Sequence, residues 1–502
     1  MSLLGIDLGT TGCKAGVFSL DSRCLGAAYR EYDMLHPQPG WSELDSVEVW
    51  GKVRAVIAEA VAAAKAAKGD PVTALSVSAF GEAFVPVTRT RRILDQSILC
   101  VDDRGGEHVE RLLGDFGREA LYAINPNLLG PNYSLPKLLW LREHRPEVFA
   151  QADYFLLWSD FIAFMLGAEA VTNNSHANRT LLFDIEQNDW SAPLMAWSGL
   201  PREKFRPVVP GGTIIGTVSA AMANELDLPL GVRIVAGGHD QCCNALGCGG
   251  IAPGHAVYGM GSFDCITPIY RRPENLRVML AEKLNVEHHV LPGLYVSFLY
   301  NQAGLLVKWF RDTFAAADVP AAGMGIYEYL DRELPSEPTD LLVLPHFDPP
   351  PHHSPETSGV IVGLKTSTRR GEILKAIREG STLYFLDSLD ALGHLGIDTT
   401  EFIASGGGAR SDAGLQLRAD ILGVPVVRPQ VTEAGVLGAA MFAGIATGTL
   451  GTPEQAVSVF VKRERIFEPD AARHARYREK HALYQQLYPV LQPVLGALAR
   501  TM

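Results

Sequence analysis

The chain has no long hydrophobic run and few cysteines. No stretch of its 502 residues approaches the ~18 apolar residues that a transmembrane helix needs. The first residues, MSLLGIDLGTTG, lack the basic start and the apolar stretch of a signal peptide. The seven cysteines are odd in number and sparse for this length, which indicates reduced thiols. We therefore expect a cytoplasmic protein with no membrane partner.

An excess of positive charge is also missing. The chain carries 44 basic and 56 acidic residues, which gives a net charge of −12. Contacts with phosphates supply much of the affinity for nucleic acids, so an acidic chain without a basic run is a poor candidate for binding them. A small anionic ligand stays open, because backbone amides can hold one whatever the net charge.

The composition, 47% hydrophobic and 20% charged, is typical of a globular protein, and the length allows about three domains or two large ones. Residues 3–8 and 14–19 are predicted strands around a glycine-rich turn. A helix over 45–68, with Ser46 as its expected N-cap, and a buried strand over 72–78 follow. Strands that alternate with helices favour an α/β layer architecture.

The same pattern begins again in the middle of the chain. Residues 254–258 and 264–270 are predicted strands around the turn Gly259–Ser262, and a helix is predicted over 433–446. We infer two related α/β domains that meet at about residues 245–255.

The first glycine-rich turn has the chemistry of a phosphate site. In Gly5–Gly12, glycines allow several N–H groups to point at one anion, and Thr10 and Thr11 add hydroxyl donors. Lys14 adds positive charge, and Asp7 could hold a hydrated Mg²⁺ that bridges phosphate oxygens. The alternative is an ordinary β-hairpin. No Walker-type phosphate loop occurs in the sequence.

The segment Gly237–Cys243 offers a candidate general base. Asp240 follows a predicted strand and two glycines, which would fix the carboxylate and let a substrate approach. Two alternatives are a helix-capping Asp240 and a zinc site made by His239 with nearby cysteines. Cys242 and Cys243 lack the spacing of a zinc-binding pair, and buried apolar cysteines are the better interpretation.

Other polar segments are weaker. Glu82 follows the predicted strand 72–78 and could bind sugar hydroxyls or lie in a solvated loop. Asp102-Asp103-Arg104 could bind a polyol or form a surface ion-pair cluster. Residues 404–411 (ASGGGARS) could pack against a ribose or a flat heterocycle. The histidines at 346, 352 and 353 lie in a proline-rich loop, where solvated side chains are expected.

Taken together, these segments resemble the phosphate and adenosine motifs of the actin-like ATPase superfamily. Within it, the chain is similar to the FGGY family of carbohydrate kinases. Residues 136–144 (PKLLWLREH) and 359–380 (GVIVGLKTSTRRGEILKAIREG) resemble the two family signatures, and residues 301–304 and 309–312 also match. The resemblance covers nearly the whole chain and implies an α/β fold of two RNase-H-like domains with an interdomain cleft.

The resemblance also implies roles for individual residues. Asp240 matches the catalytic base and Asp7 the Mg²⁺-associated aspartate. Residues matching the binding segments for ATP are Gly9, Thr10, Thr11, Lys14, Gly261, Ser262, Gly407, Gly408 and Arg410. Residues matching the sugar-binding positions are Glu82, Asp102, Asp240 and Gln241.

The implied domains are a sugar-binding one at 1–248, an ATP-binding one at 249–460 and a helical extension at 461–502. The implied reaction is ATP- and Mg²⁺-dependent phosphorylation of a terminal hydroxyl of a small ketose or polyol. A pentulose such as xylulose is the first choice, and glycerol, L-ribulose, fuculose, erythritol and gluconate are alternatives. A chaperone-type or actin-type ATPase is a further alternative, and a homodimer is common in the family.

The sequence departs from the family at the predicted sugar site. Xylulokinases usually carry Met-His, and glycerol kinases Arg-Glu, where this chain has Gly81 and Glu82. Cys100 stands where a tryptophan is usual, and the stretch Pro349–His353 replaces a Gly-Glu-Arg-x-Pro element. These departures leave the identity of the sugar open.

Overall fold

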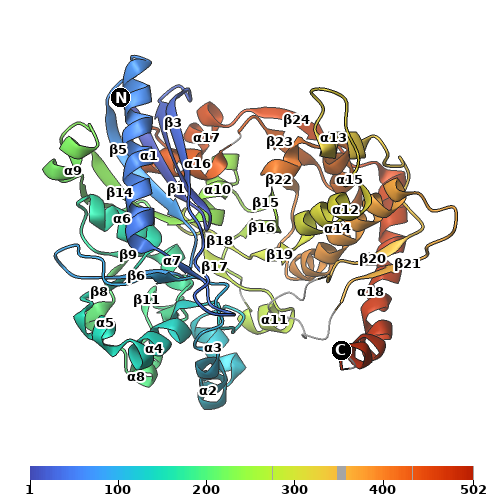
Figure 1. The fold of residues 1–502 in the computed structure, drawn as a ribbon, viewed down its shortest axis with the longest axis horizontal. Helices are drawn as coiled ribbons and strands as arrows, with labels where there is room; N and C mark the ends of the chain where they lie inside the picture. Colours follow the sequence, from blue (N-terminus) through green and yellow to red (C-terminus); the bar gives the residue numbers. More distant parts are fainter. Residues whose placement is uncertain (274, 348–357, 432, 501–502) are drawn as a thin grey trace. The chain divides into compact units, whose positions relative to one another are not determined.

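A computed structural model describes residues 1–273, 275–347, 358–431 and 433–500 (Figure 1). The stretch Pro349–His353 and the histidines within it lie outside the described residues. The chain forms two compact units. Unit 1 comprises Met1–Ile251, Arg271–Val296 and Glu433–Lys462, and unit 2 comprises Ala252–Tyr270, Ser297–Thr432 and Arg463–Met502. No helix within the described residues is long and apolar enough to cross a membrane.

Unit 1 is built on a six-stranded sheet. Its strands, in spatial order, are β13 (Ile214–Thr217), β14 (Arg233–His239), β5 (Val72–Ala79), β1 (Ser2–Leu8), β2 (Gly12–Ser19) and β3 (Cys24–Glu31). The neighbours β1–β2 and β2–β3 are antiparallel, whereas β5 pairs in parallel with both β1 and β14. The predicted strands over 3–8, 14–19 and 72–78 are confirmed.

The first long helix, α1 (Ser46–Ala66), buries an apolar stripe against this sheet. Its N-cap is Asp45 rather than the predicted Ser46, because the Asp45 carboxylate accepts hydrogen bonds from the backbone N–H groups of Val47 and Glu48. Ser46 is instead fully buried. The prediction failed by one residue, since either side chain can cap a helix.

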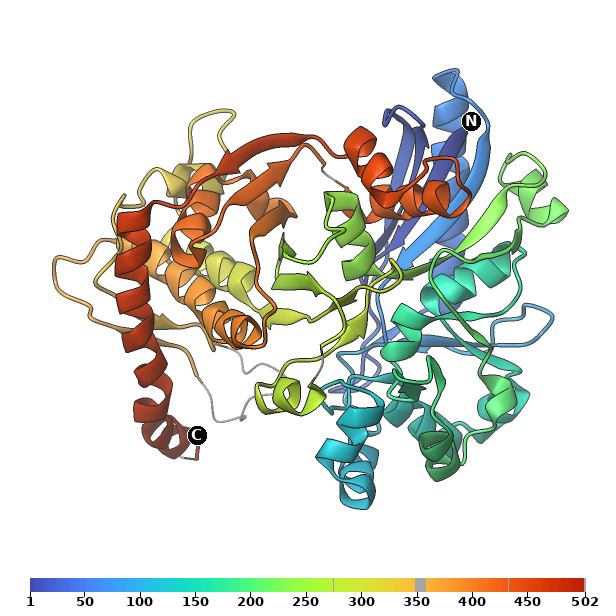
Figure 2. The same cartoon turned by 180° about the vertical axis from the view of Figure 1, so that it is seen from behind.

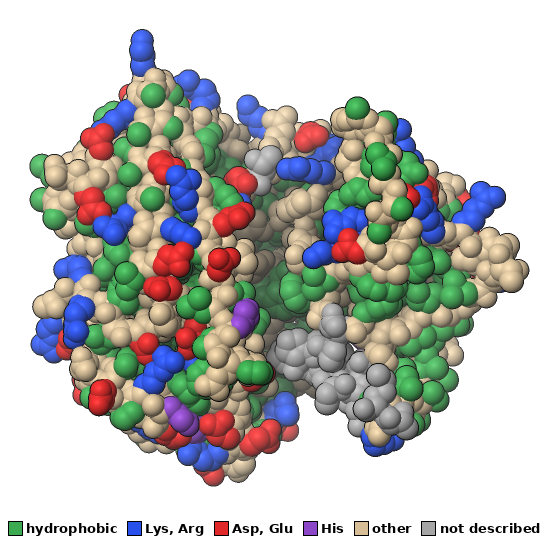
Figure 3. Space-filling view, viewed as in Figure 1, with side chains coloured by type: hydrophobic (Ala, Val, Ile, Leu, Met, Phe, Trp, Pro, Cys, Tyr) green, Lys and Arg blue, Asp and Glu red, His purple; other side chains and the backbone are tan. Residues whose placement is uncertain are grey.

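The remaining elements of unit 1 surround the sheet or extend from it. Its helices are α2 (Gly106–Phe116), α3 (Arg118–Ile124), α4 (Ser134–His144), α5 (Pro146–Gln151), α6 (Trp158–Leu166), α7 (Asn174–Asn178), α8 (Ala192–Ser198), η1 (Arg202–Lys204), α9 (Ala220–Glu225), α10 (Asp240–Cys248), α11 (Leu276–Ala281), α16 (Ala434–Ala446) and α17 (Pro453–Phe460). Its short strands are β4 (Glu43–Leu44), β6 (Phe84–Val87), β7 (Ser97–Ile98), β8 (Tyr154–Leu157), β9 (Thr172–Asn173), β10 (Phe183–Asp184), β11 (Asp189–Trp190), β12 (Val208–Val209), β17 (Glu287–His288) and β18 (Tyr295–Val296). Acidic and basic side chains are interspersed over the face of unit 1 in Figure 3.

Unit 2 repeats the arrangement of unit 1. In it β15 (His255–Met260) pairs antiparallel with β16 (Asp264–Tyr270) and in parallel with β22 (Glu401–Ser405). The sheet continues through β23 (Val426–Pro429) to β24 (Arg463–Phe467), and β19 (Leu299–Asn301) pairs with β16. A hairpin beside a parallel strand therefore opens both units, which confirms the predicted repeat.

The other elements of unit 2 are mostly helices. They are α12 (Ala303–Phe314), α13 (Ile326–Asp331), α14 (Arg370–His394), η2 (Gly407–Arg410), α15 (Asp412–Leu422) and α18 (Ala471–Ala499), with the strands β20 (Leu342–Leu344) and β21 (Val360–Val362). Helix α14 buries much of its length, including Leu374, Ile377 and Phe385.

Helix α16 lies within unit 1. The reason is close packing of its backbone. A Cβ atom on Gly5 of β1 would lie 1.9 Å from the Val436 carbonyl oxygen. A Cβ on Gly247 of α10 would lie 1.9 Å from the Ala434 carbonyl oxygen. Helix α16 lies beside β1 and α10 (Figures 1 and 2). Only glycine permits such contacts.

We expect Gly247→Ala to destabilise the protein, because the added methyl group must push α16 away from α10. Overpacking of this kind costs about 1–3 kcal/mol, which should lower Tm by about 1–3 °C in a chain of 502 residues. The matched control is Gly51→Ala in α1, where the added Cβ meets no atom within 4 Å. Thermal unfolding of the two variants checks this, and an unchanged Tm for Gly247→Ala would contradict the packing described.

Candidate active site

Asp240 is the first residue of α10, immediately after β14. A Cβ on Gly237 would lie 1.8 Å from the Val77 carbonyl oxygen, so a glycine is needed where β14 passes β5. The Asp240 side chain is 29% exposed, and its Oδ1 accepts a hydrogen bond of 2.6 Å from the Gln241 backbone N–H. The helix N-cap is His239. Gln241 is half-buried on the same turn.

The surroundings of Asp240 suit a proton acceptor. Burial, together with the negative charges of Asp7 and Glu82, raises the pKa of its carboxyl to about 7. A hydrogen bond from Gln241 and the positive charge of Arg179 oppose this shift. A carboxyl with a pKa near 7 is partly ionised at neutral pH, and its ionised form is basic enough to take a proton from a hydroxyl group.

Asp7 lies near the end of β1, beside the same group of acids. Its Oδ1 accepts a hydrogen bond of 2.5 Å from the Ser78 hydroxyl. A Cβ on Gly435 would lie 2.8 Å from the Asp7 carboxylate, so the start of α16 closes tightly over it. Burial raises the pKa of Asp7, while Ser78 and Lys14 lower it. The oxygen donors around Asp7 are of the type that Mg²⁺ prefers.

The first glycine-rich turn is a hairpin between β1 and β2. The Gly9 N–H donates to the Gly12 carbonyl oxygen at 2.9 Å. Thr10 is half-buried and Thr11 is exposed. Lys14 Nζ lies 2.5 Å from Glu433 Oε2, just before α16, so its positive charge is compensated within the protein. The turn is therefore a β-hairpin, and a β-hairpin turn of this kind can also bind a phosphate.

Unit 2 brings its own predicted residues together. Gly406, at φ +81°, could not carry a Cβ without approaching the Met260 carbonyl oxygen to 2.5 Å. The turn containing Gly261 and Ser262 therefore lies directly beside the segment that contains Gly407 and Gly408. The predicted residues exposed at the surface of this region are Gly261, Ser262, Gly407, Gly408 and Arg410.

Glu82 is buried, with a left-handed backbone (φ 62°), and it forms an ion pair with Arg179 Nη2. The second terminal nitrogen of Arg179, Nη1, pairs with Glu287. Sequence reasoning missed Arg179 and Glu287. No local pattern could have revealed them, because Arg179 lies 97 residues from one partner and 108 from the other.

Asp102 lies in a separate buried ion cluster. Its carboxylate accepts hydrogen bonds from the Ser42 backbone N–H at 2.6 Å and from Arg104 Nη2 at 2.6 Å. Arg104 also binds Glu43 at 2.6 Å and lies against the rings of Trp41 and Trp140. The cluster of ion pairs is therefore present but buried rather than at the surface, and the role of Asp102 in sugar binding stays a prediction.

The cysteines near Asp240 are apolar packing residues. Cys242 and Cys243 are buried, free thiols. Among the described residues, the only group of metal-binding side chains close enough to share an ion is Glu107, His108 and Glu143. This group contains neither His239 nor a cysteine.

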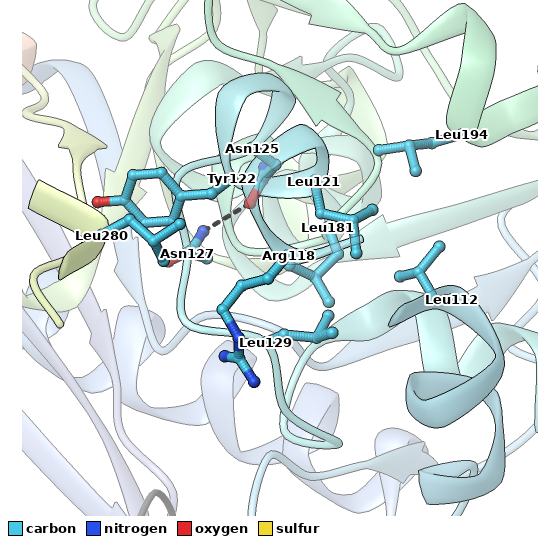
Figure 4. Close-up of a pocket in the computed structure, with 10 residues that line it drawn as sticks. All are labelled: Leu112, Arg118, Leu121, Tyr122, Asn125, Asn127, Leu129, Leu181, Leu194 and Leu280. Carbon is cyan, nitrogen blue, oxygen red and sulfur yellow. Dashed lines mark hydrogen bonds between the residues drawn. The ribbon is translucent and has the colours of Figure 1, made fainter. Parts of the chain in front are cut away.

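A pocket in unit 1 lies among residues that were not predicted to be functional (Figure 4). Its wall includes Asn125 and Asn127, which are joined by a hydrogen bond of 2.9 Å. Asn127 also accepts a bond from the Tyr133 hydroxyl. The full lining is Leu112, Arg118, Leu121, Tyr122, Asn125, Asn127, Leu129, Leu181, Leu194 and Leu280. None of the predicted site residues lines it.

Comparisons with known proteins place this chain among carbohydrate kinases. Residues 2–247 match the N-terminal domain of the FGGY family of carbohydrate kinases, and residues 278–447 match its C-terminal domain. The xylulose kinase of Bacillus subtilis (strain 168) is 26% identical, covering 97% of this chain and 96% of that protein. The glycerol kinase of Bordetella parapertussis is 30% identical, covering 93% of this chain and 92% of that protein.

A solved structure extends this similarity to the fold. The xylulose kinase from Rhodospirillum rubrum is 27% identical, with a TM-score of 0.89, and covers 99% of this chain and 100% of that one. The predicted α/β fold of two RNase-H-like, actin-like ATPase domains is therefore confirmed. Since the two family matches together span most of the sequence, the chain belongs to the FGGY family of carbohydrate kinases.

Proposed function

We propose that this kinase transfers the γ-phosphoryl group of ATP to a terminal hydroxyl of a small ketose or polyol, with Asp240 as the general base. The observation that carries the proposal is the Asp240 carboxyl, which follows β14 and is partly exposed. Burial and the charges of Asp7 and Glu82 raise its pKa to about 7. As the hydroxyl oxygen forms its bond to phosphorus, its proton passes to Asp240 and the bond to ADP breaks.

Three groups of residues would hold the nucleotide and its metal ion. Asp7, held by Ser78, would bind hydrated Mg²⁺, which when bound neutralises phosphate charge. The hairpin residues Gly9, Thr10, Thr11 and Lys14 would contact phosphates. Gly261, Ser262, Gly407, Gly408 and Arg410, which are exposed at one region of unit 2, would contact phosphates and the nucleoside.

The first substrate to test is a pentulose such as xylulose, because relatives named xylulose kinase match nearly the whole chain. Glycerol is the second, because a glycerol kinase is 30% identical. L-ribulose, fuculose, erythritol and gluconate complete the panel. The family membership disfavours the chaperone-type or actin-type ATPase. The predicted domain boundaries, cytoplasmic location and homodimer stay predictions.

We expect Asp240→Asn to keep substrate binding but to lower kcat by at least ~10²-fold, since the amide cannot accept the hydroxyl proton. Steady-state turnover in a coupled ADP-release assay, with sugar binding by calorimetry, measures both effects. Asp70→Asn, at an exposed acid that pairs with the N-terminus, is the control. Turnover unchanged by Asp240→Asn would refute the assignment of the base.

The pH profile tests the same group in the wild-type enzyme. Because the pKa of Asp240 is raised to about 7, the carboxyl takes up a proton, and the base is lost, as pH falls through that value. We expect log kcat/KM to fall with a slope of about one below pH ~7, since this parameter reports the free enzyme. A profile that stays flat down to pH ~5 would contradict the shift.

We expect Gly435→Ala to impair catalysis without unfolding the protein. The added methyl group would lie 2.8 Å from the Asp7 carboxylate and displace it. A misplacement of about 1 Å can cost ~10²-fold in rate, so a loss of at least ~10-fold in kcat/KM for MgATP is expected. Gly51→Ala again serves as the control, and full activity of Gly435→Ala would argue against a role for Asp7.

A further inference from the structure

Arg179 is a buried arginine enclosed by fixed partners. It is 6% exposed, and its two terminal nitrogens pair with two different carboxylates, those of Glu82 and Glu287. The face of its guanidinium lies over the Tyr133 ring, with Cζ 5.1 Å from the ring centroid. Glu287 is itself held by Asn285, whose Nδ2 donates to Glu287 Oε1 at 2.7 Å. The guanidinium and both carboxylates are therefore held in fixed positions.

Gly81 creates the space that Arg179 fills. A Cβ on Gly81 would lie 3.0 Å from Arg179 Cγ and 2.9 Å from His239 Cδ2. A larger residue at position 81 would have to displace one of these side chains. Position 81 carries no positive charge here, and the nearby positive charge is instead that of Arg179, at the end of α7.

The charge of Arg179 is more than compensated. The cluster of Glu82, Arg179 and Glu287 is here called the carboxylate clamp. One positive charge faces two acids, so the clamp carries a net negative charge when both acids are ionised. Asp240 lies within electrostatic reach of the clamp, since Glu82 raises its pKa and Arg179 lowers it. Asp7 adds a further negative charge near Asp240, and the buried His239 has its pKa lowered well below the usual value and is neutral.

This charge balance discriminates between substrates. The clamp offers no uncompensated cation to a substrate carboxylate, which would also be repelled by Glu82 and Asp240. Hydroxyl groups, by contrast, donate well to carboxylates. Arg179 engages Oε1 of Glu82, and Oε2 accepts no hydrogen bond from any group in the described part of the chain. A substrate hydroxyl is a suitable donor for that oxygen.

We infer that this kinase acts on uncharged polyhydroxyl compounds and discriminates against sugar acids, and that Arg179 is the positioning residue that fixes Glu82 as the acceptor of substrate hydroxyls. The inference rests on the proposed function, because it concerns the acceptor of the same reaction. It separates neutral ketoses and polyols from the aldonate alternative, gluconate.

The first test needs no variant. Wild-type kcat/KM is measured with ATP for neutral acceptors (xylulose, ribulose, fuculose, glycerol, erythritol) and for gluconate. We expect at least one neutral compound to exceed gluconate by ~10²-fold or more. Preference for gluconate would overturn the inference while leaving a sugar kinase in place. If no compound stimulates ADP release, the proposed function fails instead.

Variants of the clamp test its mechanism. Glu287→Gln removes one of the two compensating charges, so the ratio of kcat/KM for gluconate to that for the best neutral substrate should rise by at least ~5-fold. Arg179→Gln should raise KM for the neutral substrate by at least ~10-fold and move the acidic limb of the pH profile to higher pH, because a positive charge near Asp240 is lost. Arg179→Lys, which keeps the charge, should restore the position of that limb.

Controls keep these results interpretable. Glu186→Gln breaks an exposed ion pair with Arg272 in the same unit and should leave all parameters unchanged. Removing one partner of a buried pair can destabilise a protein, so each Tm is measured, and Arg179→Lys is the milder variant. An unmoved pH limb in a folded Arg179→Gln protein, or an unmoved substrate ratio in folded Glu287→Gln, would contradict the role assigned to the clamp.

Discussion

The direct contact of the α16 backbone with β1 and α10 is the constraint on which unit 1 depends. Gly5 and Gly247 bring main-chain atoms of three elements to distances that no side chain could occupy. The same contact places Gly435 over the Asp7 carboxylate and Glu433 beside Lys14. Helix α16, more than 400 residues after β1 in the sequence, therefore packs directly against this first strand. Close packing, rather than a polar network, holds these groups in position.

Burial of several acids in one region has an electrostatic consequence. Asp7, Asp240, Glu82 and Glu287 would repel one another strongly if all were ionised and unpaired. The protein relieves this repulsion unevenly. Ser78 donates to Asp7, and Arg179 pairs with both Glu82 and Glu287. Among the described residues, Asp240 accepts a hydrogen bond only from a backbone N–H, and its pKa is raised. The acid left with the least support is the one suited to accept a proton.

Much of the fold was predictable because its signals are local. The glycine turns, the strand alternation and the cap region of α1 lie within short segments, and the resemblance of the motifs to a known family extended them to the whole architecture. The pairing of Arg179 with Glu82 and Glu287, and of Lys14 with Glu433, could not be predicted, since each joins residues distant in sequence. The placement of α16 in unit 1 depends likewise on long-range packing, not on composition.

The narrow space around Gly81 limits how this lineage of proteins could change its substrate. A Cβ at position 81 would lie 3.0 Å from Arg179 Cγ and 2.9 Å from His239 Cδ2, so these two side chains already fill the space beside Gly81. A single mutation that enlarges residue 81 would collide with Arg179 and His239 before it could contribute a new contact. A larger side chain at position 81 therefore depends on a prior change at position 179 or 239 that opens this space.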